Sequence, residues 1–260
     1  MVSFMSEFAD PQDDAEHHHD HAHRPNRSHY MVHRHRDVSG GVARAAVFGI
    51  SDGLVSNVAL ILGVAAAEAE RSSVLVAGTA GLLAGATSMA AGEYVSMKAQ
   101  AELVERELRI EAKSLATQPA LETAELASIY RSRGLDAEQA LTMAEAVMTD
   151  PDVALEVHAR EELGVDPDEV GNPVGAAVGS FIAFAIGALL PLLPWFFSAG
   201  DAAIAASAII GAIATLLVGG TIATFTGRSI VRTALRQLGW AVVACGATWL
   251  IGSWLGASIT

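Results

Sequence analysis

The amino-acid sequence predicts an all-α membrane protein with five transmembrane helices and a helical insert between the second and third. Hydrophobic residues make up 52% of the 260 residues and gather in 41–97 and 173–260, in runs of the roughly 20 residues that span a bilayer. Between them, 98–172 carries 17 acidic and seven basic residues and has no alternating strand pattern. We expect spans one and two in the first stretch, the insert next, spans three to five last, and a separate tail over 1–40.

The tail and the overall charge exclude several classes of protein. Residues 1–40 hold eight of the nine histidines and predict a disordered, solvated tail whose imidazoles can bind divalent metals loosely. The net charge of −13 argues against a nucleic-acid partner, and the single Cys245 excludes a disulfide framework or cysteine-based metal cluster. The sequence has neither a phosphate-binding loop nor a nucleophile-elbow motif. We therefore expect no enzyme, no ATP-driven pump and no prosthetic group.

The first two spans each carry an acid within an apolar run. Asp52 lies about a third of the way along the first span, over 42–67, and is either a functional residue or a hydrogen-bonding partner in helix packing. In the second span, which begins near Val74, Met89, Glu93 and Met97 are four residues apart and share one helix face. We expect Asp52 to face this side of the second span across the short hairpin.

The ligand types in this pair of spans indicate the ion. A carboxylate at membrane depth is costly unless a cation visits it. Asp52 and Glu93 alone would suit protons or Ca²⁺, and the Met89 thioether shifts the preference toward first-row transition ions such as Fe²⁺, unless Met89 only packs. Because such ligands bind metal only when deprotonated, metal/proton antiport follows as a hypothesis. Glu93 could be a ligand, a proton carrier or both.

Helix caps divide the insert into four helices. The first is the continuation of the second span and ends near Pro119, which opens a second helix closed by Gly134. Asp136 begins a capping-box sequence for the third, and Asp150 precedes a proline that starts the fourth. Gly164 ends the fourth helix.

Acidic residues recur on three of these helices at the spacing that metal sites need. Divalent ions are held on helices by acids three or four residues apart, repeated on facing helices. A solvated acidic face gives the same spacing for any one pair, but three pairs in a protein with intramembrane acids favour a metal-binding domain. The candidate ligands are Glu107 and Glu111, then Glu122 and Glu125, then His158 with Glu161 and Glu162.

The last three spans and the basic residues predict the orientation. The spans are expected over 173–194, 202–220 and 236–257. Fifteen of the 16 lysines and arginines fall on the side of the N-terminus and insert, and only Arg71 falls on the other. The positive-inside rule therefore predicts a cytoplasmic N-terminus and insert and an external C-terminus.

Several motifs resemble the vacuolar iron transporter family in its bacterial form, over residues 35–257. They are HRDVSGG at 35–41, DGLVS at 52–56, LGV at 62–64, GATSMAAGEYVS at 85–96 and REELGV at 160–165. The resemblance implies a homodimeric five-span transporter that moves Fe²⁺, and often Mn²⁺, Co²⁺ or Zn²⁺, out of the cytoplasm against protons. The pathway residues carry over to Asp52 and Met89.

The resemblance also identifies insert residues and a departure. The family's insert acids correspond to Glu111, Glu122, Glu125 and Glu162, whereas His158 stands where relatives place a methionine, and Ser114 where a further acid is expected. We expect a homodimeric inner-membrane exporter of Fe²⁺ and related ions. The alternatives are a membrane-anchored di-iron ferroxidase, disfavoured because the insert has no paired Glu-x-x-His motif, and a metal store or sensor.

Overall fold

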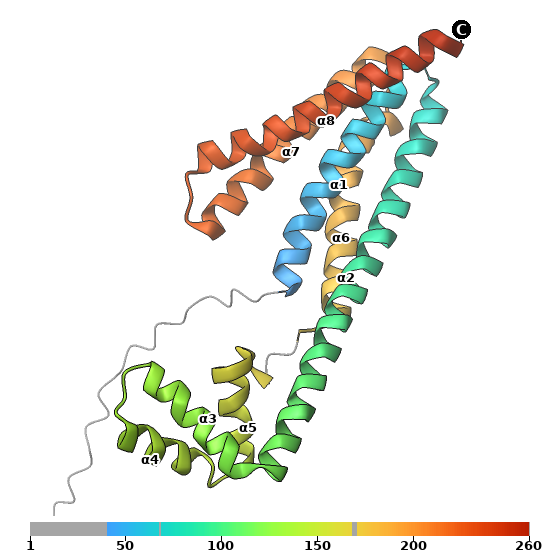
Figure 1. Ribbon diagram of the computed structural model, residues 1–260. Coiled ribbons are helices and arrows are strands. Elements are labelled where there is room, and N and C mark those ends of the chain that lie inside the picture. The colour runs from blue at the N-terminus through green and yellow to red at the C-terminus, as the bar shows by residue number, and fades with distance from the viewer. Residues whose placement is uncertain (1–40, 68, 168–170, 260) are drawn as a thin grey trace, which may run out of the picture. The chain divides into compact units, whose positions relative to one another are not determined.

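The computed structural model describes residues 41–67, 69–167 and 171–259, and within these ranges every regular element is a helix (Figure 1). The histidine-rich stretch of the tail lies outside the described residues. The elements are α1 (Gly41–Ala66), α2 (Arg71–Thr117), α3 (Pro119–Ser132), α4 (Ala137–Val147), α5 (Pro151–His158), the π-helical turn η1 (Ala159–Leu163), α6 (Pro173–Leu192), the 3-10 turn η3 (Leu193–Phe196), α7 (Gly200–Thr226) and α8 (Ile230–Ile259).

Five of these helices are long and apolar enough to cross a bilayer, which confirms the predicted fold class. They are α1, α2, α6 continued by η3, α7 and α8. The fourth of these, α7, is longer than predicted and includes Thr221, Thr224 and Thr226, whose hydroxyls bond to backbone carbonyls three or four residues earlier instead of to water. Gly227, with φ +64°, ends it.

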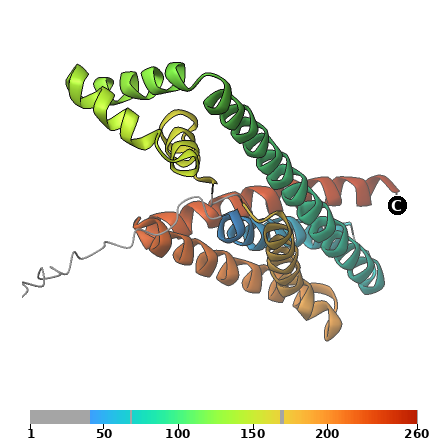
Figure 2. The same cartoon turned by 90° about the horizontal axis from the view of Figure 1, so that it is seen from below.

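Helix α1 lies at the centre of the membrane bundle. It packs against α2, α6, α7 and α8, and Figures 1 and 2 show α1, α2 and α6 side by side from two directions. The α1–α6 contact is close because glycines on both helices meet the opposite backbone. A Cβ at Gly53 would overlap the carbonyl oxygen of Phe184, and one at Gly187 would overlap that of Ile50. This close contact holds α6 against α1, the helix that carries Asp52.

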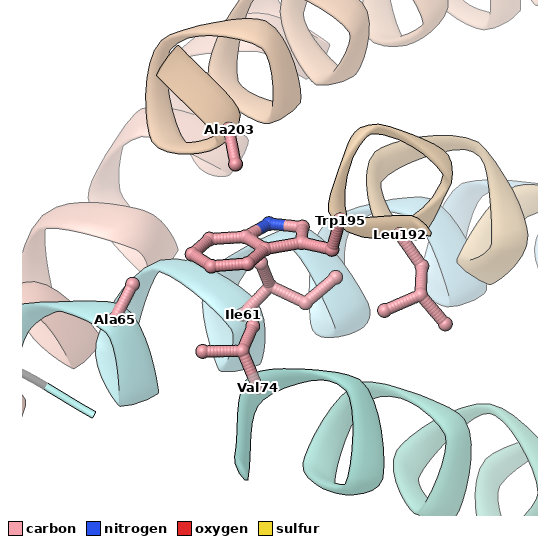
Figure 3. Close-up of a cluster of buried hydrophobic side chains, with 6 residues drawn as sticks. All are labelled: Ile61, Ala65, Val74, Leu192, Trp195 and Ala203. Carbon is pink, nitrogen blue, oxygen red and sulfur yellow. The ribbon is translucent and has the colours of Figure 1, made fainter. Parts of the chain in front are cut away.

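An apolar cluster closes the end of the bundle remote from the insert (Figure 3). Its centre is Trp195, 2% exposed, whose indole packs among side chains of α1, α2 and α7. The indole Nε1 donates to Ser207 Oγ at 3.0 Å, and Ser207 donates to the Pro191 carbonyl at 2.7 Å. The tryptophan therefore buries its ring while its one polar atom stays bonded. The cluster comprises Ile61, Ala65, Val74, Leu192, Trp195 and Ala203.

Helix α2 joins the membrane bundle to the insert without interruption. Its 47 residues correspond to about 70 Å at 1.5 Å per residue, more than twice the roughly 30 Å of a bilayer core. The apolar part ends near Met97, and acids follow from Glu102 onward. One rigid element therefore carries both membrane residues and insert residues.

The caps predicted for the insert are present. Asp136 Oδ1 accepts from the backbone N–H groups of Glu138 and Gln139 at 3.0 and 2.9 Å, and Asp150 caps α5 in the same way. Gly134, with φ +105°, closes α3. A small core, formed by Leu126, Ala127, Tyr130, Ala140 and Ala144, holds α3 against α4.

Candidate metal sites in the insert and the membrane

Four helical segments of the insert bring acids and one histidine together. In a first group, Glu111 of α2, Glu122 of α3 and His158 of α5 each offer a ligand atom, and these atoms lie within 4.8 Å of one another. In a second group, Glu122, Glu125 and Glu162 do the same. Two ligands on opposite sides of one ion are about 4 Å apart, so each group is close to the size of a metal site. Glu122 belongs to both groups.

The backbone orients His158 as a ligand. Its Nδ1 lies 2.8 Å from the carbonyl oxygen of Ala154, one helical turn earlier. Because a carbonyl can only accept, this short bond places a hydrogen on Nδ1. Nε2 lies 3.4 Å from the backbone carbonyl oxygen of Glu122, which is longer than the bond at Nδ1, and in the tautomer with its hydrogen on Nδ1 it keeps the lone pair that a metal needs. A bond from the other ring nitrogen to a carbonyl is the usual support of a metal-binding histidine.

The crowding of acidic groups in the cluster favours a bound cation. Burial raises the pKa of Glu111, and the negative charges of Glu162, Glu122 and then Glu125 raise it further, while His158 lowers it. Burial, followed by Glu125 and Glu122, likewise raises the pKa of Glu162. Glu111 Oε1 is buried without a hydrogen-bond partner among the described residues. A divalent ion would remove both the repulsion and the unpaired oxygen.

The π-helical turn separates two adjacent predicted ligands. Glu161 and Glu162 both lie in η1, yet Glu162 joins the second group whereas Glu161 forms an ion pair with Arg133. Glu107 pairs with its neighbour Arg106 at 3.0 Å. Within the described part of the chain, Glu107 and Glu161 belong to neither group. Single π-turns are frequent at functional sites because they redirect side chains.

In the membrane, Asp52 lines a cavity of about 270 Å³ between α1, α2 and α6. Met89 is half-buried and packs beside Phe184 of α6, whose ring lines the same cavity. Small residues of α2 leave room for it, since a Cβ at Gly85 would overlap the Phe184 ring. The cavity is lined by Asp52, Ser56, Asn57, Leu60, Gly81, Gly85, Ser88 and Phe184.

Glu93 lies closer to the insert than Asp52 does. It is 9% exposed, and its carboxylate pairs with Arg44 of α1 at 3.2 Å. Met97, one turn further, packs against Ala45 and Ala176. Because α1 and α2 run antiparallel, Glu93 lies level with the start of α1, about two turns from Asp52. Asp52 and Glu93 therefore occupy different levels of the bundle, and the expected face-to-face arrangement holds only for Asp52 and the Met89 region.

Two polar residues at these levels were not predicted from the sequence. Arg44 lies eight residues before Asp52, a spacing that places it two turns away on the same helix. Asn57 lies five residues after Asp52. An amide within an apolar span is the signal that marks it.

These features define a class: a multi-pass helical membrane protein in which one span extends into an acidic, histidine-containing candidate metal site. The family model described as "VIT family" matches residues 43–253, and the chain belongs to this family. This confirms the resemblance found in the sequence motifs.

Curated relatives match over most of their length. The protein named "Vacuolar iron transporter" from Centaurea cyanus is 30% identical over 234 residues, covering 88% of this chain and 96% of the relative. "Vacuolar iron transporter 1" from Oryza sativa is 33% identical over 222 residues, covering 84% and 85%. "Vacuolar iron transporter 2" from the same plant is 35% identical over 190 residues, covering 73% and 77%.

Proposed function

We propose that this protein transports Fe²⁺ out of the cytoplasm in exchange for protons, and that it also accepts Mn²⁺ and related divalent ions such as Co²⁺ and Zn²⁺. The observation that carries the proposal is the buried group of Glu111, Glu122 and His158 on the extension of a membrane span. Two carboxylates and an imidazole suit borderline ions such as Fe²⁺. The names of the relatives, all vacuolar iron transporters, support the same substrate.

The insert gathers ions and α2 leads them to the membrane. Ions captured beside Glu122 pass Glu93, where the carboxylate must exchange Arg44 for the ion, and then reach Met89 and Asp52. Ligands bind metal only when deprotonated, so protons arriving from the other side release the ion. Membrane carboxylates at two levels, Glu93 and Asp52, support stepwise exchange.

The orientation and the assembly are part of the same proposal. The distribution of lysine and arginine supports a cytoplasmic insert and an external C-terminus, and we place the protein in the inner membrane. Asp52 is exposed on the single chain, although it lies in a membrane span. A second copy covering α1 and α2 would remove this charge from lipid, which supports a homodimer.

Reconstituted protein tests the transport function. Proteoliposomes with an imposed pH gradient should take up Fe²⁺ under anaerobic conditions, and Asp52→Ala or Met89→Ala should abolish uptake while gel filtration shows an unchanged protein. Thr215→Val, which alters a buried hydroxyl outside the Asp52 cavity, should leave uptake unchanged. Full uptake by both pathway variants would refute the assignment, and dioxygen consumption on Fe²⁺ addition would favour a ferroxidase.

A further inference from the structure

Asn57 lies five residues after Asp52 on α1, and one contact orients its side-chain amide. The Nδ2 group donates to the backbone carbonyl of Ala188 on α6 at 2.6 Å. A carbonyl can only accept, so this bond fixes which atom of the amide is nitrogen, and Oδ1 points elsewhere. Asn57 is 2% exposed, and Oδ1 has no hydrogen-bond partner in the described part of the chain.

The unpaired oxygen faces α2 at the Asp52 cavity. A Cβ placed at Gly81 would lie 3.1 Å from Asn57 Oδ1, and both residues line that cavity. An unpaired buried acceptor is costly, and a bilayer core supplies no solvent to satisfy it. The partner of this oxygen must therefore come from what the cavity holds.

The polar atoms of the cavity are mainly acceptors. Asp52 contributes a carboxylate, and Asn57 contributes a carbonyl oxygen. The hydroxyl of Ser56 already donates to the backbone oxygen of Asp52 at 2.6 Å. Ser88 also lines the cavity, and its hydroxyl can donate or accept. A cavity in which oxygen acceptors exceed donors is complementary to a cation, and carbonyl and carboxylate oxygens together suit hard divalent ions.

We propose that Asn57 Oδ1 is a metal ligand of the membrane pathway, in the cavity that Asp52 also lines. The inference rests on the proposed transport function and adds a residue that sets ion preference. A carboxylate and a thioether alone favour softer ions. The amide oxygen raises the share of hard ligands at this level and therefore favours Mn²⁺ over Zn²⁺.

Two substitutions separate a ligand role from a packing role. Asn57→Leu removes the oxygen at similar volume, whereas Asn57→Asp keeps an oxygen at this position. Both variants lose the Nδ2 bond to Ala188, so the effect of losing that bond is common to them. Thr215→Val is the matched control, because Thr215 is 1% exposed, its hydroxyl has no partner among the described residues, and it lines a different, apolar cavity.

The measurement is the initial rate of Mn²⁺ and of Zn²⁺ uptake into proteoliposomes, with gel filtration and thermal unfolding of each variant as a check of folding. Loss of one contact to a charged ion should raise the KM for Mn²⁺ about tenfold in Asn57→Leu. The KM for Zn²⁺ should change less. Asn57→Asp should keep the KM for Mn²⁺ near that of the wild type, and Thr215→Val should match the wild type for both ions.

Two results would overturn the inference while leaving transport intact. Equal shifts for both ions in Asn57→Leu and Asn57→Asp would mean that Asn57 only packs against Ala188. An unchanged preference for Mn²⁺ over Zn²⁺ in Asn57→Leu would mean that Asn57 Oδ1 accepts a hydrogen bond from water and does not bind the ion. Absence of flux in the wild type is a distinct outcome, which refutes the proposed function and the Asn57 role with it.

Discussion

Glu122 is the carboxylate that both candidate metal groups share, so its replacement by glutamine tests the insert directly. Glutamine keeps the shape of the side chain and removes its charge. A charged contact to the ion contributes about 1.5–3 kcal/mol, which corresponds to a loss of about 10- to 100-fold in affinity. Because Glu122 is in both groups, we expect this loss at every ion the insert binds.

Thermal unfolding with added metal measures a second quantity, the stabilisation of the folded protein by the bound ion. At a metal concentration of about 100 times Kd, one bound ion stabilises the folded protein by about 2.7 kcal/mol. After a hundredfold loss of affinity in Glu122→Gln, the same concentration stabilises it by only about 0.4 kcal/mol. Without metal, the variant should be at least as stable as the wild type, because one buried negative charge is removed from a repulsive cluster.

The assay is calorimetric titration of full-length protein in detergent with Mn²⁺, which avoids oxidation, beside the unfolding measurements. Glu125→Gln alters the second group only, so it should weaken only the part of the metal binding that depends on this group. Glu107→Gln is the matched control, since Glu107 pairs with Arg106 outside both groups. Equal losses in Glu107→Gln and Glu122→Gln, or unchanged binding in Glu122→Gln, would refute the assignment of these residues.

Three further outcomes are expected from the structure. The pKa of Glu111 is raised, so its stabilising contribution is present below about pH 4.5, the ordinary glutamate pKa, and is lost as the pH rises through the higher folded-state pKa. Metal-free protein should therefore melt at a higher temperature just above pH 5 than at pH 7.5. A lower melting temperature just above pH 5 would contradict this. Trp195→Ala should cost about 3–5 kcal/mol in unfolding free energy, measured by denaturant unfolding, whereas a loss below about 1 kcal/mol would mean that the cluster in Figure 3 does not hold the bundle. Gly53→Ala should lower the melting temperature, because its Cβ would overlap a backbone carbonyl, whereas Gly239→Ala, with open space around it, should not; equal effects would refute the close α1–α6 contact.

Composition and capping residues predict most of the fold. The five spans follow from runs of apolar residues, and the insert helices follow from residues such as Asp136 and Gly134, because a capping bond or a left-handed φ depends on a single residue and its near neighbours. The exact ends of α7 cannot be predicted from composition and capping residues. Threonine hydroxyls can bond either to water or to the preceding turn, and the sequence does not decide between them.

The candidate sites are predictable only to the level of a helix face. The acids of the insert are visible as pairs, but the choice of Glu162 over Glu161 depends on the π-turn, which shifts one residue around the helix axis. In the membrane, the level of Glu93 relative to Asp52 depends on how far α1 and α2 slide along each other. Contacts with α6 fix that register, such as the bond from Asn57 to Ala188, which is 131 residues later in the chain.

The uninterrupted length of α2 makes it a lever. Met89 and Glu111 are 22 residues apart on one helix, about 33 Å at 1.5 Å per residue. A tilt of about five degrees centred on Met89 therefore moves Glu111 by roughly 3 Å, more than the length of a metal–ligand bond of about 2.1 Å. A small change of tilt in the membrane is thus amplified into a displacement of Glu111 that exceeds the length of a metal–ligand bond.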